Sequence, residues 1–386
     1  LQNNNQLILA SAATGGTRTI VTETDEAWLD VQDDIPWLKG DKEFVWLSER
    51  DGWRHAYAVS RATGAARLIT PGNFDVMSVS LVDHTGGWLY YDASPENATQ
   101  RYLWRTRLDG KGKAERLTPA GQAGSHRYTI SPDAKYAFHS WSSFDSPGPT
   151  ELVSLPKHTV ERTLAANTEL MARVKEAITH PGEFFQVTIA DGSTLDGWMI
   201  KPRDFDPNRR YPVLMYVYGE PAGQTVLDSY MGGSRLWYQL LADQGYIIAS
   251  VDNMGTPAPK GRAWRKAVYE QIGVLSSMQQ AQAVQAITRT RPYVDSTRVG
   301  IWGWSGGGSS TLQAMFRYPE VYQVGMSVAP VPDQRLYDTI YQERYMGLLG
   351  PNEAKYLAAS PVSHAAGLKG HLLLVHGSGD DNVHFQ

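Results

Sequence analysis

The sequence predicts an all-β domain over residues 1–165 and an α/β domain over residues 166–386. Three observations support this division. The 386 residues are enough for about two domains of ordinary size. The first part consists of short apolar and aromatic runs, such as EFVWLSE and GWLYYDAS, between Gly, Asp and Pro turns. The second part alternates apolar strands with helical stretches, which is typical of a mostly parallel sheet covered by helices on both faces.

A weak repeat predicts that the all-β domain is part of a β-propeller. Four segments each place a turn before a short strand with one arginine: Arg18, Arg67, Arg116 and Arg162. Their spacings of 49, 49 and 46 residues fit a four-stranded propeller blade of about 40–50 residues. About four blades are therefore expected here, with more upstream of Leu1. A β-sandwich whose strands resemble each other by chance is the alternative.

The α/β domain begins with a polar, helical stretch near residues 165–183. A hairpin follows, with the dipeptide Asp191-Gly192 at its turn. Strands of a parallel sheet are predicted at 211–219, 246–252, 298–304, 324–330 and 371–377. Helices are predicted between them at 234–245, 264–292, 309–320 and 333–347. Functional residues are expected where the parallel strands end, at the carboxyl edge of the sheet.

The composition excludes several classes of function. The formal net charge of −4 provides no basic field for nucleic acid or an anionic membrane. The absence of cysteine rules out disulfides and thiolate sites and leaves the compartment open. No apolar run approaches the roughly 18–20 residues of a membrane span. No metal or organic cofactor is expected, because no motif for either occurs.

The segment GIWGWSGGGSS, residues 300–310, carries the clearest catalytic motif. Residues 303–307 form a G-x-S-x-G nucleophile elbow between a predicted strand and a predicted helix. Ser305 would occupy a sharp, strained turn in which the flanking glycines avoid collisions with neighbouring backbone. Gly306 would direct its N–H at the oxyanion of acyl transfer. A purely structural turn, or a phosphate site at the helix N-terminus, is the alternative.

The loop HGSGDDN, residues 376–382, is the candidate for a catalytic acid. In an α/β-hydrolase the acid follows the serine along the chain, and the histidine follows the acid. Asp380 and Asp381 both occupy this loop, and position alone does not choose between them. A solvated turn or a helix cap is the alternative role for the pair.

No histidine in the sequence is a convincing general base. The base should follow the acid by a helix and a strand, which takes about 30 residues, yet only six residues follow Asp380. His371 and His376 lie at the ends of the predicted strand, and His384 is too close to the acid. We therefore expect the catalytic histidine beyond Gln386, and residues 1–386 alone to be inactive. The initial Leu also suggests an internal piece of a longer protein.

Several longer motifs make the chain similar to dipeptidyl peptidase IV and its bacterial relatives in the prolyl oligopeptidase group of serine peptidases. The most specific are YPVLMYVYGEP, GIWGWSGGG, VAPVPDQRLYDTIYQERYMG and LLLVHGSGDDNVHFQ. The resemblance implies a propeller followed by an α/β-hydrolase domain. It also implies a triad in which Ser305 is the nucleophile and Asp380 the acid. Tyr218 and Gly306 would form the oxyanion hole, although a lone tyrosine at a strand end more often serves packing.

The resemblance further implies the residues that would bind substrate. Asn382 matches an asparagine that holds the carbonyl before the scissile bond; a residue that only shapes the turn is the alternative. A small apolar pocket for proline or alanine would be lined by Val331, Tyr337, Tyr341 and Val383. Without the resemblance, Tyr337, Tyr341 and Tyr345 form an i, i+4, i+8 stripe that more often marks a core.

The sequence departs from the family at several positions. Gly306 stands where a tyrosine commonly walls the pocket, and Gln334 where a tryptophan is expected, so the proline preference is expected to be looser. Met254-Gly255 replaces a usual Arg-Gly, without a functional interpretation. The glutamate pair that grips the substrate's amino terminus has no counterpart in residues 1–165 and is expected upstream.

The resulting hypothesis is a serine exopeptidase that releases N-terminal di- or tripeptides from peptides with a free amino terminus. An acylaminoacyl peptidase, an oligopeptidase or an esterase on the same scaffold is the enzymatic alternative. A pseudo-peptidase that serves as a binding platform is the non-enzymatic one. By resemblance, the hydrolase domain could also form a homodimer. A periplasmic or otherwise extracytoplasmic location is expected, with a cytoplasmic one as the alternative.

Overall fold

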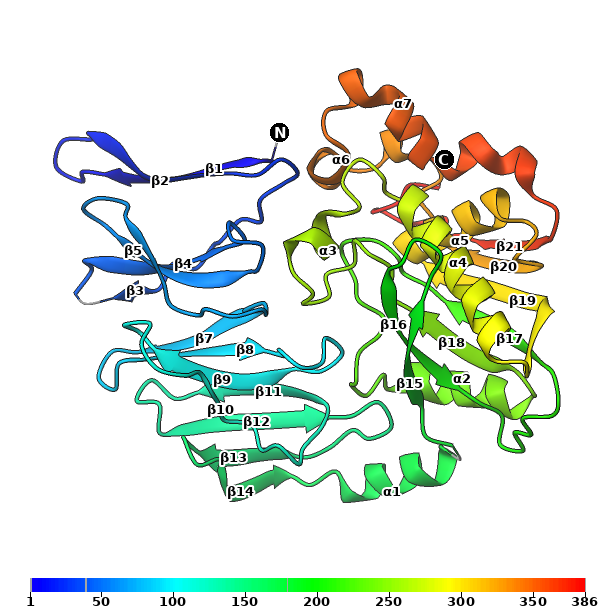
Figure 1. The fold of residues 1–386 in the computed structure, drawn as a ribbon, viewed down its shortest axis with the longest axis horizontal. Helices are drawn as coiled ribbons and strands as arrows, with labels where there is room; N and C mark the ends of the chain where they lie inside the picture. Colours follow the sequence, from blue (N-terminus) through cyan, green and yellow to red (C-terminus); the bar gives the residue numbers. More distant parts are fainter. Residues whose placement is uncertain (1, 39, 179, 386) are drawn as a thin grey trace.

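The structure, a computed structural model, describes residues 2–38, 40–178 and 180–385 (Figure 1). Antiparallel sheets are stacked on one side of the molecule, and a helix-covered sheet forms the other side. Helix α1 (Thr168–Ala177) follows the last strand of the stack and leads into the second sheet.

Residues 4–165 form four antiparallel sheets. The first has only two strands, whereas the others have four each, in the orders β3-β4-β5-β6, β10-β9-β8-β7 and β11-β12-β13-β14. The strands are β1 (Asn4–Ala10), β2 (Thr17–Thr24), β3 (Trp37–Leu38), β4 (Glu43–Ser48), β5 (His55–Ser60), β6 (Ala66–Leu68), β7 (Ser78–Asp83), β8 (Trp88–Ala93), β9 (Tyr102–Arg107), β10 (Glu115–Arg116), β11 (Ser125–Ile130), β12 (Tyr136–Ser142), β13 (Thr150–Ser154) and β14 (Thr159–Ala165).

The sequence repeat corresponds to these sheets. Its four arginines lie on β2, β6, β10 and β14, the last strand in each sheet. The first repeat unit forms a two-stranded ribbon rather than a full blade, so three complete four-stranded units are present among the described residues.

The sheets pack face to face, as propeller blades do. Strand β8 shows why, because its side chains alternate between two cores. Leu89 and Tyr91 pack with residues of β4 and β5, whereas Tyr90 packs with Leu103 and the sheet that follows. Leu89, Tyr90 and Tyr91 are each at most 2% exposed. The alternation therefore joins consecutive sheets into one stack.

The second half of the chain contains a seven-stranded sheet in the order β15-β16-β18-β17-β19-β20-β21. Its strands are β15 (Glu183–Thr188), β16 (Thr194–Ile200), β17 (Tyr211–Tyr216), β18 (Ile247–Val251), β19 (Val294–Trp304), β20 (Val324–Val328) and β21 (His371–Val375). The five strands from β17 to β21 are parallel, and β15 and β16 form the antiparallel hairpin. Gly192 has a φ of 87° at the hairpin turn, a conformation that favours glycine.

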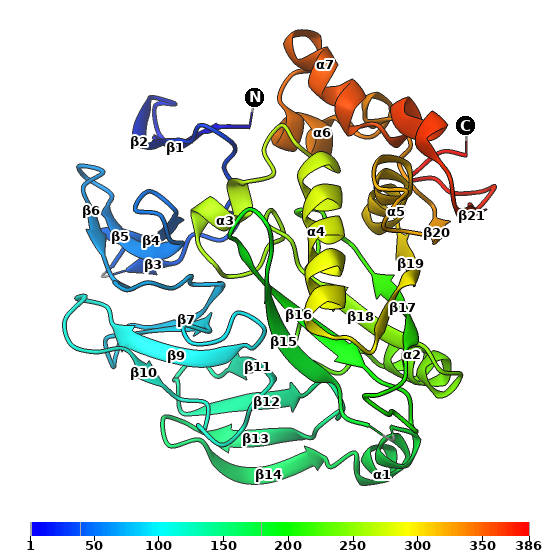
Figure 2. The same ribbon diagram turned by 45° about the vertical axis from the view of Figure 1, so that its right-hand side comes forward.

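Helices cover both faces of this sheet (Figure 2). Helices α4 and α5 contribute to the core on one face, and α2 contributes to the core on the other. The helices are α2 (Gly233–Asp243), α3 (Arg262–Lys266), α4 (Val274–Thr290), α5 (Gly306–Arg317), α6 (Thr339–Met346) and α7 (Leu349–Ala359), with 3-10 helices η1 (Gln334–Leu336) and η2 (Pro361–Gly367). The prediction of an α/β-hydrolase fold behind propeller-type sheets is confirmed.

Two of the predicted helices are broken in the structure. The stretch 264–292 divides into α3 and α4, because Glu270 and Gly273 adopt φ angles of 61° and 72° that an α-helix cannot contain. The stretch 333–347 divides into η1 and α6 at Asp338, whose carboxylate accepts from the N–H of Tyr341 at 2.7 Å and caps α6. Helix α7 was not predicted.

Buried ion pairs join the two halves of the molecule. Arg265 of α3 donates to Glu49 and Asp75 of the stacked sheets, with Nε to Glu49 Oε1 at 2.9 Å and Nη2 to Asp75 Oδ1 at 3.0 Å. Lys266 Nζ lies 3.1 Å from Glu49 Oε2, and Arg262 donates to Asp25 at 2.7 Å. Helix α3 thus attaches the hydrolase part to the sheets beside it (Figure 2).

Two kinds of feature are absent from the described part of the chain. None of its helices has the length and apolar character needed to cross a membrane. No three His, Cys, Asp or Glu side chains in it gather closely enough to hold a metal ion.

Candidate active site

Ser305 lies in the turn between β19 and α5, at the carboxyl edge of the parallel sheet. Its φ of 56° and ψ of −119° are strained for a residue with a side chain. Its N–H donates to Val328 O at 2.9 Å, which ties the turn to the end of β20. A Cβ on Gly303 or Gly307 would collide with the carbonyl oxygen of Val217. The turn therefore requires glycine at both positions, because a side chain at either one would clash with Val217.

Tyr218 and Gly306 lie on neighbouring elements beside Ser305. Tyr218 follows β17, and its carbonyl oxygen accepts from the Ser310 hydroxyl of α5 at 2.9 Å. Gly223 packs against the Tyr218 ring, since a Cβ there would lie 2.8 Å from the ring. Burial raises the pKa of the Tyr218 hydroxyl above its usual value, with Glu220 adding to the shift. The hydroxyl therefore remains a hydrogen-bond donor at neutral pH.

Glu220 is an acidic residue at this site that the sequence analysis did not single out. Its carboxyl Oε2 lies only 2.7 Å from the position that a Cβ on Gly306 would occupy. The side chain is 5% exposed and accepts from the Tyr341 hydroxyl at 2.6 Å. Burial raises the pKa of the Glu220 carboxyl to about 7. The raised pKa marks Glu220 as a candidate site residue, but it arises from burial in the folded protein and cannot be read from the sequence.

Asp380 is held by the backbone of its own loop, just after β21. Its Oδ1 accepts from the N–H of Val383 at 2.9 Å and of Asn382 at 3.1 Å. These two hydrogen bonds lower the pKa of the carboxyl. Asp381 is exposed and receives no hydrogen bond from the described residues. The loop geometry therefore distinguishes Asp380 as the member of the pair that the backbone holds in place.

None of the ten histidines, all of which lie in the described part of the chain, is hydrogen-bonded to the Ser305 hydroxyl. His376 Nε2 donates to Val383 O at 2.8 Å, and the same nitrogen is 3.7 Å from Asp380 Oδ2. His364 bonds to Arg317 on the outer side of α5. His371 and His384 are exposed. The structure identifies no base for the serine among them.

Some of the residues predicted to bind substrate contact one another. The Tyr337 hydroxyl donates to Asn382 Oδ1 at 3.2 Å, and the Tyr337 ring meets the Tyr341 ring edge-on with centroids 5.6 Å apart. Val331 is fixed to α5, because its N–H donates to the Ser309 hydroxyl at 2.9 Å.

The tyrosine stripe and Gln334 have separate roles in the fold. Tyr345 belongs to a core with Trp28, at a ring distance of 4.8 Å, whereas Tyr341 turns its hydroxyl to Glu220. Gln334 is 2% exposed and accepts from the Gln342 side chain at 2.6 Å. The helix pattern alone could not show that Tyr345 is buried in this core while the Tyr341 hydroxyl reaches Glu220.

The residues at the end of β18 support the loop that carries Tyr218 and Glu220. Asp252 accepts from the N–H groups of Thr225 and Val226 at 2.9 and 3.0 Å. Asn253 Nδ2 donates to Gly219 O at 3.1 Å. Burial raises the pKa of Asp252 to about 6, although these bonds oppose the shift. No role for Asp252 and Asn253 was predictable from sequence, because their contacts join residues 26 to 34 positions apart.

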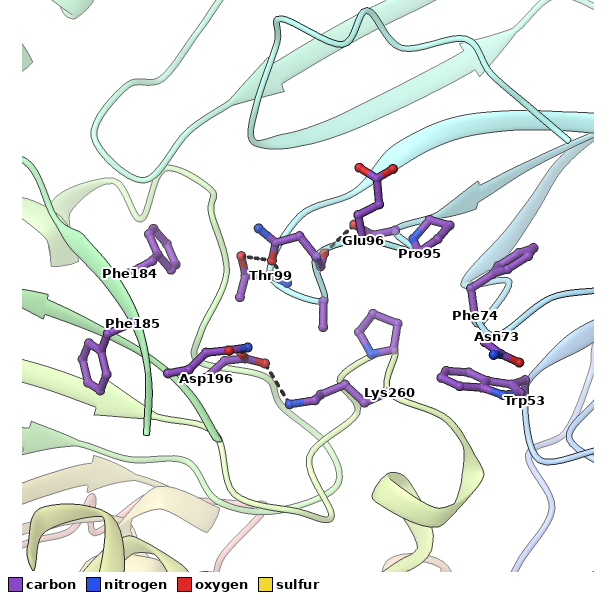
Figure 3. Close-up of a pocket in the computed structure, with 15 residues that line it drawn as sticks. Trp53, Asn73, Phe74, Pro95, Glu96, Thr99, Phe184, Phe185, Asp196 and Lys260 are labelled. Atoms are coloured by element: carbon purple, nitrogen blue, oxygen red, sulfur yellow. Dashed lines mark hydrogen bonds and ion pairs between the residues drawn. The ribbon is translucent and has the colours of Figure 1, made fainter. Parts of the chain in front are cut away.

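A large cleft lies between the stacked sheets and the β15–β16 hairpin (Figure 3). Its volume is about 650 Å³, and its lining includes Trp53, Phe74 and Phe185. Lys260 and Asp196 form an ion pair of 3.0 Å at its wall. None of the predicted site residues lines it. The cleft is therefore separate from the elbow.

The fold and the elbow define an α/β-hydrolase that follows propeller-type sheets. Residues 234–386 match the sequence model of the Prolyl oligopeptidase family, and residues 1–148 match that of the Dipeptidyl peptidase IV (DPP IV) N-terminal region. The chain belongs to the prolyl oligopeptidase family, and the resemblance seen in its motifs is confirmed.

Individual relatives agree with this assignment. The chain is 35% identical to "Probable dipeptidyl-aminopeptidase B" of Uncinocarpus reesii, an alignment that covers 87% of the chain and 37% of the relative. It is 30% identical to "Dipeptidyl peptidase 4" of Trichophyton equinum, over 95% of the chain and 48% of the relative. The crystal structure of Porphyromonas gingivalis dipeptidyl peptidase 4 is similar, with a TM-score of 0.93, 34% identity, and coverage of 100% of this chain and 54% of that one. The chain thus spans about half the length, or less, of these relatives.

Proposed function

We propose that the protein is a dipeptidyl peptidase that acts through an acyl-enzyme on Ser305. The observation that carries the proposal is the elbow itself, where the strained Ser305 lies beside Gly306 and Tyr218 at the end of the parallel strands. The names of the similar proteins supply the reaction class, since they are dipeptidyl peptidases.

The proposed reaction has two halves. In the first, Ser305 Oγ attacks the scissile carbonyl carbon, a base takes the serine proton, and the C–N bond breaks as that proton passes to the leaving amine. In the second, water attacks the ester, its proton goes to the base and returns to Ser305 Oγ, and the dipeptide leaves as a carboxylic acid. The Gly306 N–H and the Tyr218 hydroxyl would stabilise the oxyanion in both halves.

Asp380 would orient the base through its ionised carboxylate, which its loop already fixes. The base would be a histidine, as in other serine hydrolases. We propose that this histidine lies outside residues 1–386, because no described histidine bonds to Ser305. The enzyme should therefore be assayed at its natural full length, and residues 1–386 alone are expected to show no turnover.

Substrate binding is proposed for the residues around Tyr337. Asn382 would hold the carbonyl before the scissile bond, and Val331, Tyr337, Tyr341 and Val383 would line the pocket for the residue on the acyl side of that bond. The contact between Tyr337 and Asn382 supports this arrangement. Proline and alanine are the proposed residues for this pocket, and the free amino terminus would be held by groups that remain unassigned.

The test compares two 4-nitroanilide substrates with the full-length protein: Gly-Pro with a free amino terminus, and the same dipeptide with an acetylated one. We expect hydrolysis of the free substrate, with kcat/KM for the blocked one at least tenfold lower, and no hydrolysis by the Ser305→Ala variant. Preference for the blocked substrate would instead indicate an acylaminoacyl peptidase. If the full-length protein hydrolyses neither substrate, the proposal is contradicted.

A further inference from the structure

The wall of the proposed pocket contains a carboxyl group in a place where a side chain of residue 306 would otherwise lie. Gly306 has no side chain, and Glu220 Oε2 lies 2.7 Å from the position of its absent Cβ. Because Gly306 directly follows the nucleophile, the carboxyl lies next to the group that would receive the substrate carbonyl oxygen. The residue on the acyl side of the scissile bond would therefore contact it.

The carboxyl is fixed rather than free to turn away. Glu220 is 5% exposed, and the Tyr341 hydroxyl donates to its Oε2 at 2.6 Å. Tyr341 meets the Tyr337 ring, and the Tyr337 hydroxyl reaches Asn382. A chain of contacts thus runs from the neighbour of the nucleophile to the proposed carbonyl-binding asparagine. Glu220 belongs to this set of proposed substrate contacts.

The charge state of Glu220 limits what it can recognise. Its described surroundings supply one hydrogen bond, from Tyr341, and no nearby cation. An ionised carboxylate beside the oxyanion site would repel the developing negative charge. Burial raises the pKa of Glu220 to about 7, so a protonated carboxyl is available at and below neutral pH. A carboxylic acid can both donate and accept one hydrogen bond.

We propose that Glu220 is a specificity-determining residue that makes the pocket favour a short side chain with a hydroxyl group, such as serine, over alanine. This inference rests on the proposed function and deepens it, because it adds serine to the residues proposed for the pocket and ranks it above alanine. The side chain must be short, because the carboxyl lies close to the backbone of Gly306. It must carry a hydroxyl, because a hydroxyl can add a second hydrogen bond to the buried carboxyl, which otherwise has only the one from Tyr341, whereas an apolar side chain cannot.

The experiment measures kcat/KM of the full-length protein for Gly-Ser-4-nitroanilide and Gly-Ala-4-nitroanilide, which differ by one hydroxyl. We expect a serine-to-alanine ratio of about three to ten, the effect of one net hydrogen bond. Glu220→Leu should reduce the ratio to one or below, whereas Glu220→Gln, which retains a donor and an acceptor, should keep it above one. Glu320→Leu, at an exposed position after α5, is the matched control and should leave the ratio unchanged.

A second variant alters the contact between Gly306 and the Glu220 carboxyl at Gly306. Gly306→Ala places a methyl group against the Glu220 carboxyl and should also lower the ratio, and thermal melting would check that each variant is folded. A wild-type ratio near one, or a ratio that folded Glu220→Leu and Gly306→Ala both preserve, would overturn this inference. Hydrolysis of Gly-Pro-4-nitroanilide would then still uphold the proposed function. If the wild-type full-length protein hydrolyses none of the dipeptide substrates with a free amino terminus, both this inference and the proposed function are overturned.

Discussion

Ser305 combines a strained backbone with tight neighbours on both sides. Its positive φ persists because the N–H bond to Val328 and the close approach of Val217 to Gly303 and Gly307 over-determine the turn. The glycine pattern made this turn predictable from sequence. Glu220 was not predictable, because its importance arises from contacts with Gly306 and Tyr341 that are distant in sequence.

Tyr218 offers a direct test of the oxyanion assignment. Tyr218→Phe removes the hydroxyl and keeps the ring that packs on Gly223. If the hydroxyl stabilises the oxyanion, kcat of the full-length enzyme should fall by about 10²- to 10³-fold, with KM and the unfolding midpoint nearly unchanged. Tyr136→Phe, at an exposed position on β12, is the control. An unchanged kcat in Tyr218→Phe would show that the tyrosine serves packing alone.

At the scale of elements, strands β11 and β12 contain a buried histidine stack. His126 Nδ1 lies 2.9 Å from His139 Nε2, and the rings are stacked with centroids 5.2 Å apart. Tyr128 stacks on His139 at 4.5 Å and bonds to His158 at 2.8 Å. Burial lowers the pKa of His126 to about 4 and that of His139 to about 3, and His158 adds to both shifts.

The stack predicts that stability falls in mild acid. The folded state keeps both histidines neutral, whereas the unfolded chain binds protons below its ordinary histidine pKa of about 6.5. The free energy of unfolding should therefore decrease as pH falls from about 6.5 to about 4, by up to about 1.4 kcal/mol per pH unit for each histidine. Other groups near the stack are Glu151, 3.6 Å from His139, and Arg116, whose charge also disfavours protonation of His126.

Urea unfolding at several pH values would measure this effect. His139→Phe should be less stable at pH 7.5 because it loses a buried hydrogen bond, but its stability should depend less on pH. His84→Gln, in an exposed turn, is the control and should retain the wild-type dependence. The same pH dependence in His139→Phe as in the wild type would contradict the assignment of the effect to this stack.

The sequence predicted the strands of the second sheet better than its helices. The apolar runs located β17 to β21, because a buried parallel strand requires a continuous run. The helix boundaries depended on backbone conformations at Glu270 and Gly273, which the helical pattern around them concealed. Helix α7 was also missed, because it lies in the long connection between α6 and β21, for which no helix was predicted.

At the scale of the whole molecule, the buried charges of α3 connect the hydrolase part to the stacked sheets. Arg265 is 8% exposed and pairs with Glu49 and Asp75, which are 9% and 2% exposed. The composition could not reveal this network, since its members are 190 or more positions apart. The repeat and the motifs predicted both halves of the fold, but not how they join.

Loss of Arg265 should weaken this connection. Arg265→Met would leave the buried Asp75 without its paired cation and Glu49 with Lys266 alone, and the free energy of unfolding should fall by about 3–5 kcal/mol. Limited proteolysis between the halves should also become faster. Arg298→Met removes a partly exposed arginine that pairs with Asp295, and should cost less than about 1 kcal/mol. Equal effects of the two variants would contradict the structural role of Arg265.

The proposed function of the whole molecule requires Ser305 to be a reactive nucleophile. The direct measurement is labelling of the full-length protein with a fluorophosphonate probe, followed by mass spectrometry of the modified peptide. We predict one modified residue, Ser305, and complete loss of labelling in Ser305→Ala. Absence of labelling in the wild type, or labelling that persists in Ser305→Ala, would contradict the proposed serine peptidase and favour a protein that only binds.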